Sequence, residues 1–215
     1  MTRALILDFG GVISRTLFET HDQTEAALGL PPGTLTWRGP FDPDSDPLWR
    51  EQQAGRISER DYWLQRSRET GLLVGHHWDS MQQLVQGARA AQPDLVIRPE
   101  ARAAIAQARL HGCKLAVLSN ELDLFYGAQF RARLPLLADF DVVADATYTG
   151  ILKPDPRAYL DCVAKLRLTV ADCVFVDDQP ANVAGARQVG LPTIWFNVRE
   201  PAASFAQALQ VLLKN

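Results

Sequence analysis

The chain has little cysteine, no long apolar run and no excess of charge of either sign. Its three cysteines, Cys113, Cys162 and Cys173, are scattered and include no C-x-x-C pair, so we interpret them as buried core thiols in a reducing compartment. No apolar run approaches the roughly 20 residues that span a bilayer, and the apolar stretch at the N-terminus is too short for a signal peptide. With 22 Lys and Arg against 25 Asp and Glu, the net charge of −3 gives no electrostatic reason to expect nucleic acid or an anionic membrane as a partner. We therefore expect a cytoplasmic protein without either partner.

Apolar residues are plentiful enough for a buried core. They make up 47% of 215 residues, which is sufficient for one domain with a sizeable insertion or for two small domains. Residues 1–13 and 92–215 alternate short apolar runs with helical patterns, as is typical of a parallel α/β sheet. The strands that we expect are Ala4–Asp8, Lys114–Ser119, Asp141–Ala144, Cys173–Asp177 and Thr193–Phe196.

Proline and glycine mark the ends of the helices between these strands. Pro99 and Pro156 suit the first position of a helix, and Asp155 is a candidate cap for the second of them. Gly112 and Gly190 are placed to end helices, the latter a helix that starts near Ala181.

Residues 14–91 have a different character, with no β-rich alternation. They carry four of the five tryptophans, Trp37, Trp49, Trp63 and Trp78, which form either an aromatic wall for a ligand or the core of this segment. The Pro-, Gly- and Asp-rich stretch from Pro31 to Pro47 is expected to be loop. Ser58 followed by Asp61 predicts a capped helix carrying Tyr62, Trp63 and Leu64. We expect a mostly helical domain, 14–91, inserted into an α/β domain made of 1–13 and 92–215.

Polar residues follow four of the expected strands, where open parallel sheets bind ligands. The first strand ends at Asp8, a carboxylate placed to attack a substrate, beside Gly10 and Gly11, which allow a tight turn. The second ends at Ser119 and Asn120, whose polar groups could receive a phosphoryl oxygen. Taken alone, Asp8 also suits a turn, and Ser119 and Asn120 also suit a helix cap.

Two further sites follow later in the chain. Lys153 lies between a loop and a proline-started helix, where it could neutralise both an aspartate nucleophile and phosphoryl oxygens; a solvated surface lysine is the ordinary alternative. Asp177 and Asp178 follow the fourth strand and repel each other unless a cation lies between them and Asp8; two exposed turn aspartates are the alternative. Oxygen ligands of this kind suit Mg²⁺. Asn182 either caps the next helix or orients Asp178.

Together these sites resemble the haloacid dehalogenase superfamily, whose motifs appear here in order. The resemblance covers the whole expected core, and Gly55-Arg56-Ile57-Ser58 with the aromatic helix after it is similar to the helical caps of one subgroup. It implies a Rossmann-like parallel-sheet core with a small helical cap domain. It also implies a Mg²⁺-dependent hydrolase acting on a small-molecule phosphorylated or halogenated substrate.

The resemblance gives each motif residue an expected role. Asp8 would be the covalent nucleophile and a metal ligand, and Gly10 would bind the metal through its carbonyl. Ser119 and Asn120 would hold the phosphoryl group, and Lys153 would pair with that group and with the nucleophile. Asp178 would bind Mg²⁺ directly, and Asp177 directly or through water.

Gly10 is a departure from the family pattern. Phosphatases of this family have an aspartate there that serves as general acid and base, and such help is typically worth about 100- to 10,000-fold in rate. A substrate group, a water, or a cap residue such as His76 or His77 could substitute. Glycine keeps the carbonyl, so the metal site is expected to survive.

Three functions are therefore open. The leading one is a phosphatase of a small phosphorylated metabolite that works through an aspartyl-phosphate. The second is a 2-haloacid dehalogenase, whose chemistry needs no acid; Gly10 suits it, whereas the pair Asp177 and Asp178 does not, because dehalogenases of the family carry neutral residues there. The third is a catalytically weakened binding or regulatory protein.

Overall fold

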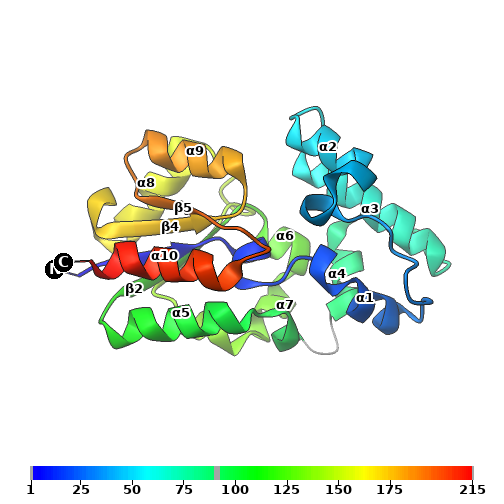
Figure 1. The fold of residues 1–215 in the computed structure, drawn as a ribbon, viewed down its shortest axis with the longest axis horizontal. Coiled ribbons are helices and arrows are strands. Elements are labelled where there is room, and N and C mark those ends of the chain that lie inside the picture. Colours follow the sequence, from blue (N-terminus) through cyan, green and yellow to red (C-terminus); the bar gives the residue numbers. More distant parts are fainter. Residues whose placement is uncertain (1, 90–92, 215) are drawn as a thin grey trace. The chain divides into compact units, whose positions relative to one another are not determined.

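A five-stranded parallel sheet forms the centre of the α/β part of the chain. The computed structural model describes residues 2–89 and 93–214, and the strand order is β3-β2-β1-β4-β5 (Figure 1). Every neighbouring pair runs parallel. The strands are β1 (Ala4–Leu7), β2 (Lys114–Ser119), β3 (Val142–Asp145), β4 (Cys173–Asp177) and β5 (Thr193–Trp195). The α/β class with a Rossmann-like parallel sheet is thereby confirmed.

The strand ends differ from the expected ones by one residue at three places. β1 stops at Leu7 and β5 at Trp195, and β3 is shifted to Val142–Asp145. At β1 the physical reason is a turn: the Asp8 N–H still donates to the Val176 carbonyl at 2.9 Å, but a tight irregular turn follows over Phe9–Ile13.

Helices cover both faces of this sheet. α8 (Pro156–Leu166) and α9 (Pro180–Gln188) pack on one face, and α5 (Pro99–Leu110) and α10 (Pro201–Leu213) on the other (Figure 1). β1 and β4 lie in the middle and are buried along their whole length, as expected for strands covered on both sides. All four helices begin with proline, which confirms the expected starts at Pro99 and Pro156.

The chain divides into two compact units. One contains the residues up to Arg15, Asp94–Asp123 and the residues from Arg131 onward; the other contains Thr16–Pro93 and Leu124–Phe130. We call the first the α/β unit and the second the helical unit. The sequence pattern gave no sign that Leu124–Phe130 would join the helical unit, and the expected boundary at 91/92 lies outside the described residues.

The helical unit is built of helices joined by turns and loops. Its helices are α1 (His21–Leu28), α2 (Pro47–Gln53), α3 (Glu59–Leu73) and α4 (Met81–Arg89). Two short helices, α6 (Leu122–Tyr126) and α7 (Ala128–Ala132), have residues in both units. Short 3₁₀ turns of this unit lie at Phe18–Thr20, Gly39–Phe41 and Pro43–Ser45. Those at Pro135–Asp139 and Val170–Asp172 belong to the other unit, and Pro93–Val96 lies where the two units divide along the chain. The stretch expected to be loop up to Pro47 therefore contains two of these turns, and Pro47 itself begins α2, because proline suits a first helical position.

The expected capped helix after Ser58 is confirmed. In α3 the Ser58 hydroxyl accepts from the Asp61 N–H at 3.1 Å, and the Ser58 N–H donates to the Asp61 carboxylate at 3.1 Å. Phe18 contacts four rings with centroids 5.3 to 6.0 Å away, those of Trp37, Trp49, Tyr62 and Trp63. These tryptophans therefore belong to the core of the helical unit, with Trp37 and Trp63 buried.

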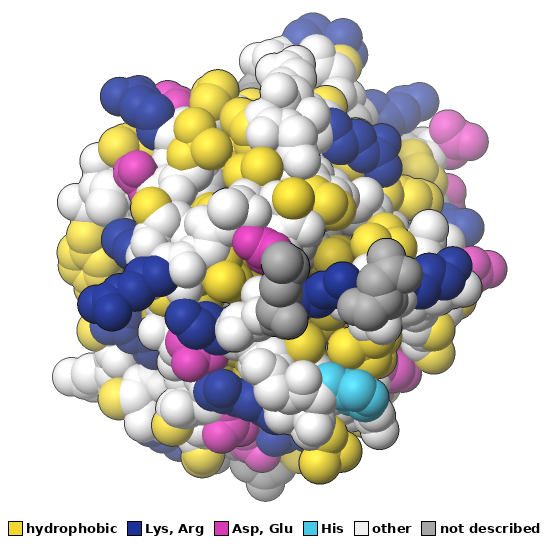
Figure 2. All heavy atoms as spheres, turned by 90° about the vertical axis from the view of Figure 1, so that its left-hand side faces the viewer, with side chains coloured by type: hydrophobic (Ala, Val, Ile, Leu, Met, Phe, Trp, Pro, Cys, Tyr) yellow, Lys and Arg dark blue, Asp and Glu magenta, His cyan; other side chains and the backbone are white. Residues whose placement is uncertain are grey.

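The remaining expectations from composition concern cysteine, membranes and surface charge. The three cysteines are free and buried, as predicted. Among the described residues no helix is long and apolar enough to cross a bilayer. Figure 2 shows the face at the amino ends of the strands, where Lys and Arg side chains lie among acidic and hydrophobic ones rather than in one continuous basic surface.

Candidate active site

The turn after β1 presents Asp8 and brings it next to Asp178. Gly11 has a φ of +79°, and a Cβ built on it would lie 2.8 Å from Asp178 Oδ2. Glycine is therefore required at position 11 by both the backbone and the neighbouring carboxylate. Gly10 has an ordinary φ of −71°, and a Cβ built there meets nothing within 4 Å. The turn itself does not demand glycine at position 10.

Lys153 joins the carboxylates of two strands. Its Nζ donates to Asp8 Oδ1 at 2.8 Å and to Asp177 Oδ2 at 2.6 Å, and its side chain is 1% exposed. Burial works against the charge of Lys153, but Asp177 and Asp8 outweigh it and raise the pKa of the lysine above its ordinary value. The structure thus brings Lys153 to Asp8 across 145 positions of sequence.

The Asp8 carboxyl has a pKa above its ordinary value. Burial is the largest influence and raises its pKa; Asp177 raises it further, Lys153 lowers it, and the result is a pKa of about 6. The ammonium group of Lys153 therefore bonds the carboxylates of both Asp8 and Asp177, and it does not bring the pKa of Asp8 back to its ordinary value. A carboxylate in this state gains strongly from any further positive charge placed beside it.

Asn120 holds the backbone of Lys153. Its Nδ2 donates to the Lys153 carbonyl at 3.0 Å, and its Oδ1 accepts from the Lys153 N–H at 2.7 Å. We expected the Asn120 side chain to contact a phosphoryl group, but in this structure it positions the lysine. Ser119 ends β2 one residue earlier and is buried, with its Cα paired with that of Asp145.

Asp177 and Asp178 have different surroundings. Asp177 is fully buried, and besides Lys153 its carboxylate accepts from the Gln179 N–H at 2.8 Å and from Asn182 Nδ2 at 3.1 Å. Asn182 therefore orients Asp177, not Asp178 as one of our two alternatives had it. Asp178 is half-buried, and its backbone carbonyl accepts from Trp195 Nε1 at 3.0 Å.

These residues fit a divalent cation. Asp8, Asp177 and Asp178 each offer a carboxylate oxygen, and the three oxygens lie within 4.8 Å of one another. Carboxylate oxygens are the donors that Mg²⁺ prefers, usually one or two of them with water completing the set. Both carboxylate oxygens of Asp177 already accept hydrogen bonds, from Lys153, Gln179 and Asn182, whereas Lys153 bonds Asp8 through Oδ1. Asp8 and Asp178 are therefore the better candidates for direct ligands.

Two residues of this site were not among the sequence predictions. Arg98 is 2% exposed, its Nε donates to the Gly11 carbonyl at 2.9 Å, and its guanidinium lies 5.5 Å from the ring centroid of Phe196. Trp195 is the second. An arginine before a helix-starting proline and a tryptophan at a strand end carry no local signal of this role, since their partners are distant in sequence.

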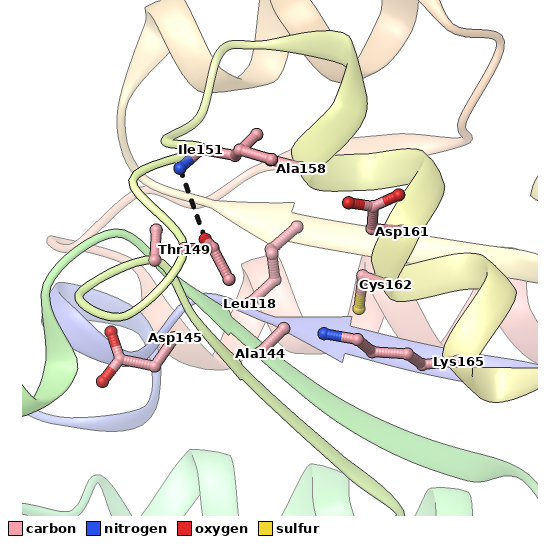
Figure 3. A pocket seen from close by; sticks show the side chains of 10 residues that line it. Leu118, Ala144, Asp145, Thr149, Ile151, Ala158, Asp161, Cys162 and Lys165 are labelled. Atoms are coloured by element: carbon pink, nitrogen blue, oxygen red, sulfur yellow. Dashed lines mark hydrogen bonds between the residues drawn. The ribbon is translucent and has the colours of Figure 1, made fainter.

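A small cavity at the edge of the sheet is too small for a substrate. It lies between β3 and α8, where Asp145, Asp161 and Lys165 are among the lining residues (Figure 3). Its volume of about 30 Å³ accommodates about one or two water molecules. The Asp8 cluster is therefore the better candidate for chemistry.

His76 and His77, the proposed substitutes for the missing acid, belong to the helical unit. Both are exposed, and the ring of His76 stacks on Trp78 at a centroid distance of 6.4 Å. A role in proton transfer stays a hypothesis for both.

Comparisons with known proteins agree on the family. The sequence model of the haloacid dehalogenase-like hydrolases matches residues 2–190. The chain is 30% identical over 214 residues to acyl-CoA dehydrogenase family member 10 of Mus musculus, covering 96% of this chain and 19% of that protein. It is 38% identical over 94 residues to a phosphatase of Mycobacterium tuberculosis, covering 43% of each. The chain thus spans less than half the length of these two relatives.

Solved structures show the same fold. The L-2-haloacid dehalogenase from Xanthobacter autotrophicus is 23% identical, with a TM-score of 0.58 over 91% of this chain and 78% of that one. A phosphatase of the same superfamily from Thermococcus onnurineus is 21% identical, with a TM-score of 0.56 over 91% and 86%. At these identities the likeness concerns the fold and leaves the choice between the two activities open.

Proposed function

This chain belongs to the haloacid dehalogenase-like hydrolases, and from that premise we propose that it is a Mg²⁺-dependent phosphatase of a small phosphorylated metabolite. The observation that carries the proposal is the shared lysine: Lys153 bonds Asp8 and Asp177, while Asp178 completes a group of three carboxylate oxygens. A cation beside Asp8 and a lysine bonded to it are what an attack on a phosphoryl group requires.

In the proposed reaction a carboxylate oxygen of Asp8 attacks phosphorus, and the bond from phosphorus to the leaving oxygen breaks. Lys153 stabilises the charge on the phosphoryl oxygens, assisted by the Ser119 hydroxyl and backbone N–H groups near Gly10 and Asn120. Water then hydrolyses the aspartyl-phosphate, which releases phosphate and regenerates Asp8.

A Mg²⁺ ion held by Asp8, the Gly10 carbonyl and Asp178 would supply the positive charge that this cluster lacks. Asp177 would orient Lys153 and, through it, Asp8. With a pKa of about 6, Asp8 is mostly ionised at neutral pH and can act as a nucleophile. The helical unit is proposed as the cap that selects the substrate.

The alternative is a dehalogenase, in which Asp8 displaces halide from carbon and no acid is needed. The missing side chain at Gly10 favours it. The pair Asp177 and Asp178 disfavours it, because a carbon-displacement reaction has no use for a cation to offset two further carboxylates.

A substrate screen separates these functions. Phosphate release from phosphorylated metabolites should occur with Mg²⁺, fall strongly when the metal is chelated, and vanish in Asp8→Asn. Halide release from 2-haloacids, independent of Mg²⁺, would replace this proposal with the alternative. Mg²⁺ and phosphate-ester binding without release of either product would select the weakened binding or regulatory protein.

A further inference from the structure

Trp195 is placed to hold the metal-side loop that follows β4. Its Nε1 donates to the backbone carbonyl of Asp178 at 3.0 Å, across 17 positions of sequence. At the same end of the sheet, the Phe196 N–H donates to the Asp177 carbonyl at 2.9 Å. Consecutive residues at the end of β5 thus hold the carbonyls of both members of the aspartate pair.

The two bonds differ in kind. The bond to Asp177 comes from the backbone, which any residue at position 196 would supply. The bond to Asp178 comes from an indole N–H, and phenylalanine or alanine at position 195 could not make it. The β4 strand ends at Asp177, so the Asp178 carbonyl lies beyond the β4–β5 pairing, and a side chain takes the place of the next backbone donor.

Apolar packing does not explain a tryptophan at this position. The Trp195 side chain is 49% exposed, whereas Phe196 next to it is 1% exposed and contacts Phe205 at a centroid distance of 5.0 Å. The core is therefore filled by Phe196. What tryptophan adds at position 195 is the donor to Asp178.

This donor bonds the backbone carbonyl of a residue whose carboxylate has little freedom. Asp178 lies against Gly11, where a Cβ would already be too close, and Gln179 Nε2 donates to its Oδ2 at 3.4 Å. Fixing the peptide plane after Asp178 limits how the residue rotates away from Gly11 and Asp8. We propose, resting on the function proposed above, that Trp195 is a positioning residue that sets the Asp178 carboxylate for Mg²⁺ through its indole N–H.

Calorimetric titration of MgCl₂ into wild-type protein, Trp195→Phe and Trp195→Ala tests this inference. Phenylalanine keeps an aromatic ring and removes the N–H, and alanine removes both. Both variants should bind Mg²⁺ about two- to tenfold more weakly, the range expected for one lost hydrogen bond. Their melting temperatures without metal should stay close to that of the wild type. Trp49→Phe makes the same substitution in the helical unit and should keep the wild-type Kd.

The outcomes separate the two proposals. Wild-type affinity in Trp195→Phe overturns the inference, and so does weakened binding in Trp195→Ala alone, because the ring and not the N–H would then matter. A lowered melting temperature of metal-free Trp195→Phe with unchanged Kd makes the residue merely structural and also overturns it. If the wild type itself binds no Mg²⁺, the proposed function fails, and this inference fails with it.

Discussion

Two buried aspartates, one in each compact unit, show how differently the two parts of the chain use charge. Asp46 in the helical unit has a fully buried side chain. It accepts four hydrogen bonds, from Gly39 N–H at 3.0 Å, Trp49 N–H at 3.0 Å, Tyr62 hydroxyl at 2.9 Å and Arg66 at 2.5 Å. Burial raises the pKa of Asp46, but these donors outweigh it and hold the pKa below the ordinary value of 3.8.

Asp8 in the α/β unit has the opposite balance. It shares one lysine with Asp177, and its pKa is raised to about 6. A carboxylate whose donors are complete stabilises the fold, whereas one left short of positive charge is poised to bind a cation or to react. The contrast therefore separates a structural carboxylate from a candidate catalytic one.

Replacing Asp8 by asparagine should have the largest effect. Asp8→Asn should lower phosphate release by at least about 10,000-fold, the scale seen when a nucleophile is removed. Its melting temperature near pH 7 should be unchanged or higher, because a carboxylate with a raised pKa disfavours the folded state when ionised. Substantial turnover in this variant would mean that water attacks the substrate directly. Asp8 would then not be the nucleophile, and its contrast with Asp46 would no longer concern catalysis.

Two glycines, Gly39 in the helical unit and Gly10 beside Asp8, differ in the space available for a side chain. A Cβ at Gly39 in the helical unit would overlap the ring of Phe18, whereas a Cβ at Gly10 meets open space.

With no acid at position 10, wild-type rates should depend steeply on leaving-group acidity, with aryl and acyl phosphates much faster than alkyl phosphates. Gly10→Asp should fold, raise alkyl-phosphate rates about 100-fold and flatten that dependence.

A series of phosphate esters that spans several units of leaving-group pKa measures this effect. Insensitivity of the wild-type chemical step to the leaving group would show that another residue supplies the proton. Gly39→Asp is the matched comparison and should lower the melting temperature, since position 39 has a φ of +49° as well as the overlap with Phe18.

Within the α/β unit, Mg²⁺ affinity should differ between variants of the two adjacent aspartates, Asp177 and Asp178. Asp178→Ala should weaken Mg²⁺ binding by roughly 50-fold, within the usual range for disturbing a metal site. Asp177→Asn should weaken it less and lower the melting temperature more, because Lys153 and Asn182 both bond the Asp177 carboxylate. Calorimetry and thermal unfolding of the two variants measure this; equal Mg²⁺ binding by wild type and Asp178→Ala would remove Asp178 from the proposed ligands.

The smallest expected effect lies in the helical unit. Asp46→Asn should lower the free energy of unfolding by about 2 kcal/mol, roughly 30-fold in the folding equilibrium, because it weakens the buried pair with Arg66. Since the folded-state pKa is lowered, this stabilisation is present above pH 3.8 and is lost as pH falls through the lower folded-state value.

Urea unfolding followed by tryptophan fluorescence reports mainly on the helical unit, which holds four of the five tryptophans. The difference between wild type and Asp46→Asn should shrink below pH 3.8. If the difference in free energy of unfolding stays constant from pH 7 into strong acid, the charge of Asp46 contributes nothing to stability. Asp46 would then not serve as the structural counterpart of Asp8.

The sequence predicted the strand ends well because they are local features. Each buried strand is a short apolar run, and the residue that ends the run is where polar chemistry begins, as at Asp8, Ser119 and Asp177. The same locality explains why the capping box at Ser58 was predictable, since its partner lies three residues away.

Asn120 and Asn182 were harder to assign. Each was recognised as polar and near a strand end, but their hydrogen bonds go to Lys153 and Asp177, and their partners follow from loop geometry rather than from spacing. Of the paired glycines, position 11 is the one that the fold requires, as its positive φ and the approach of Asp178 reveal.

The sequence by itself therefore determined the parallel α/β core, the helical character of the insertion and the order of the acidic and basic groups along the strands. Only the tertiary structure decided that Lys153, which the family resemblance had already paired with Asp8, also bonds Asp177, and that Arg98 and Trp195 hold the carbonyls of Gly11 and Asp178. The physical reason is distance along the chain. The pattern of buried positions along a strand or helix depends on neighbouring residues. A hydrogen bond between residues 8 and 153, in contrast, forms only once the strands have paired in register.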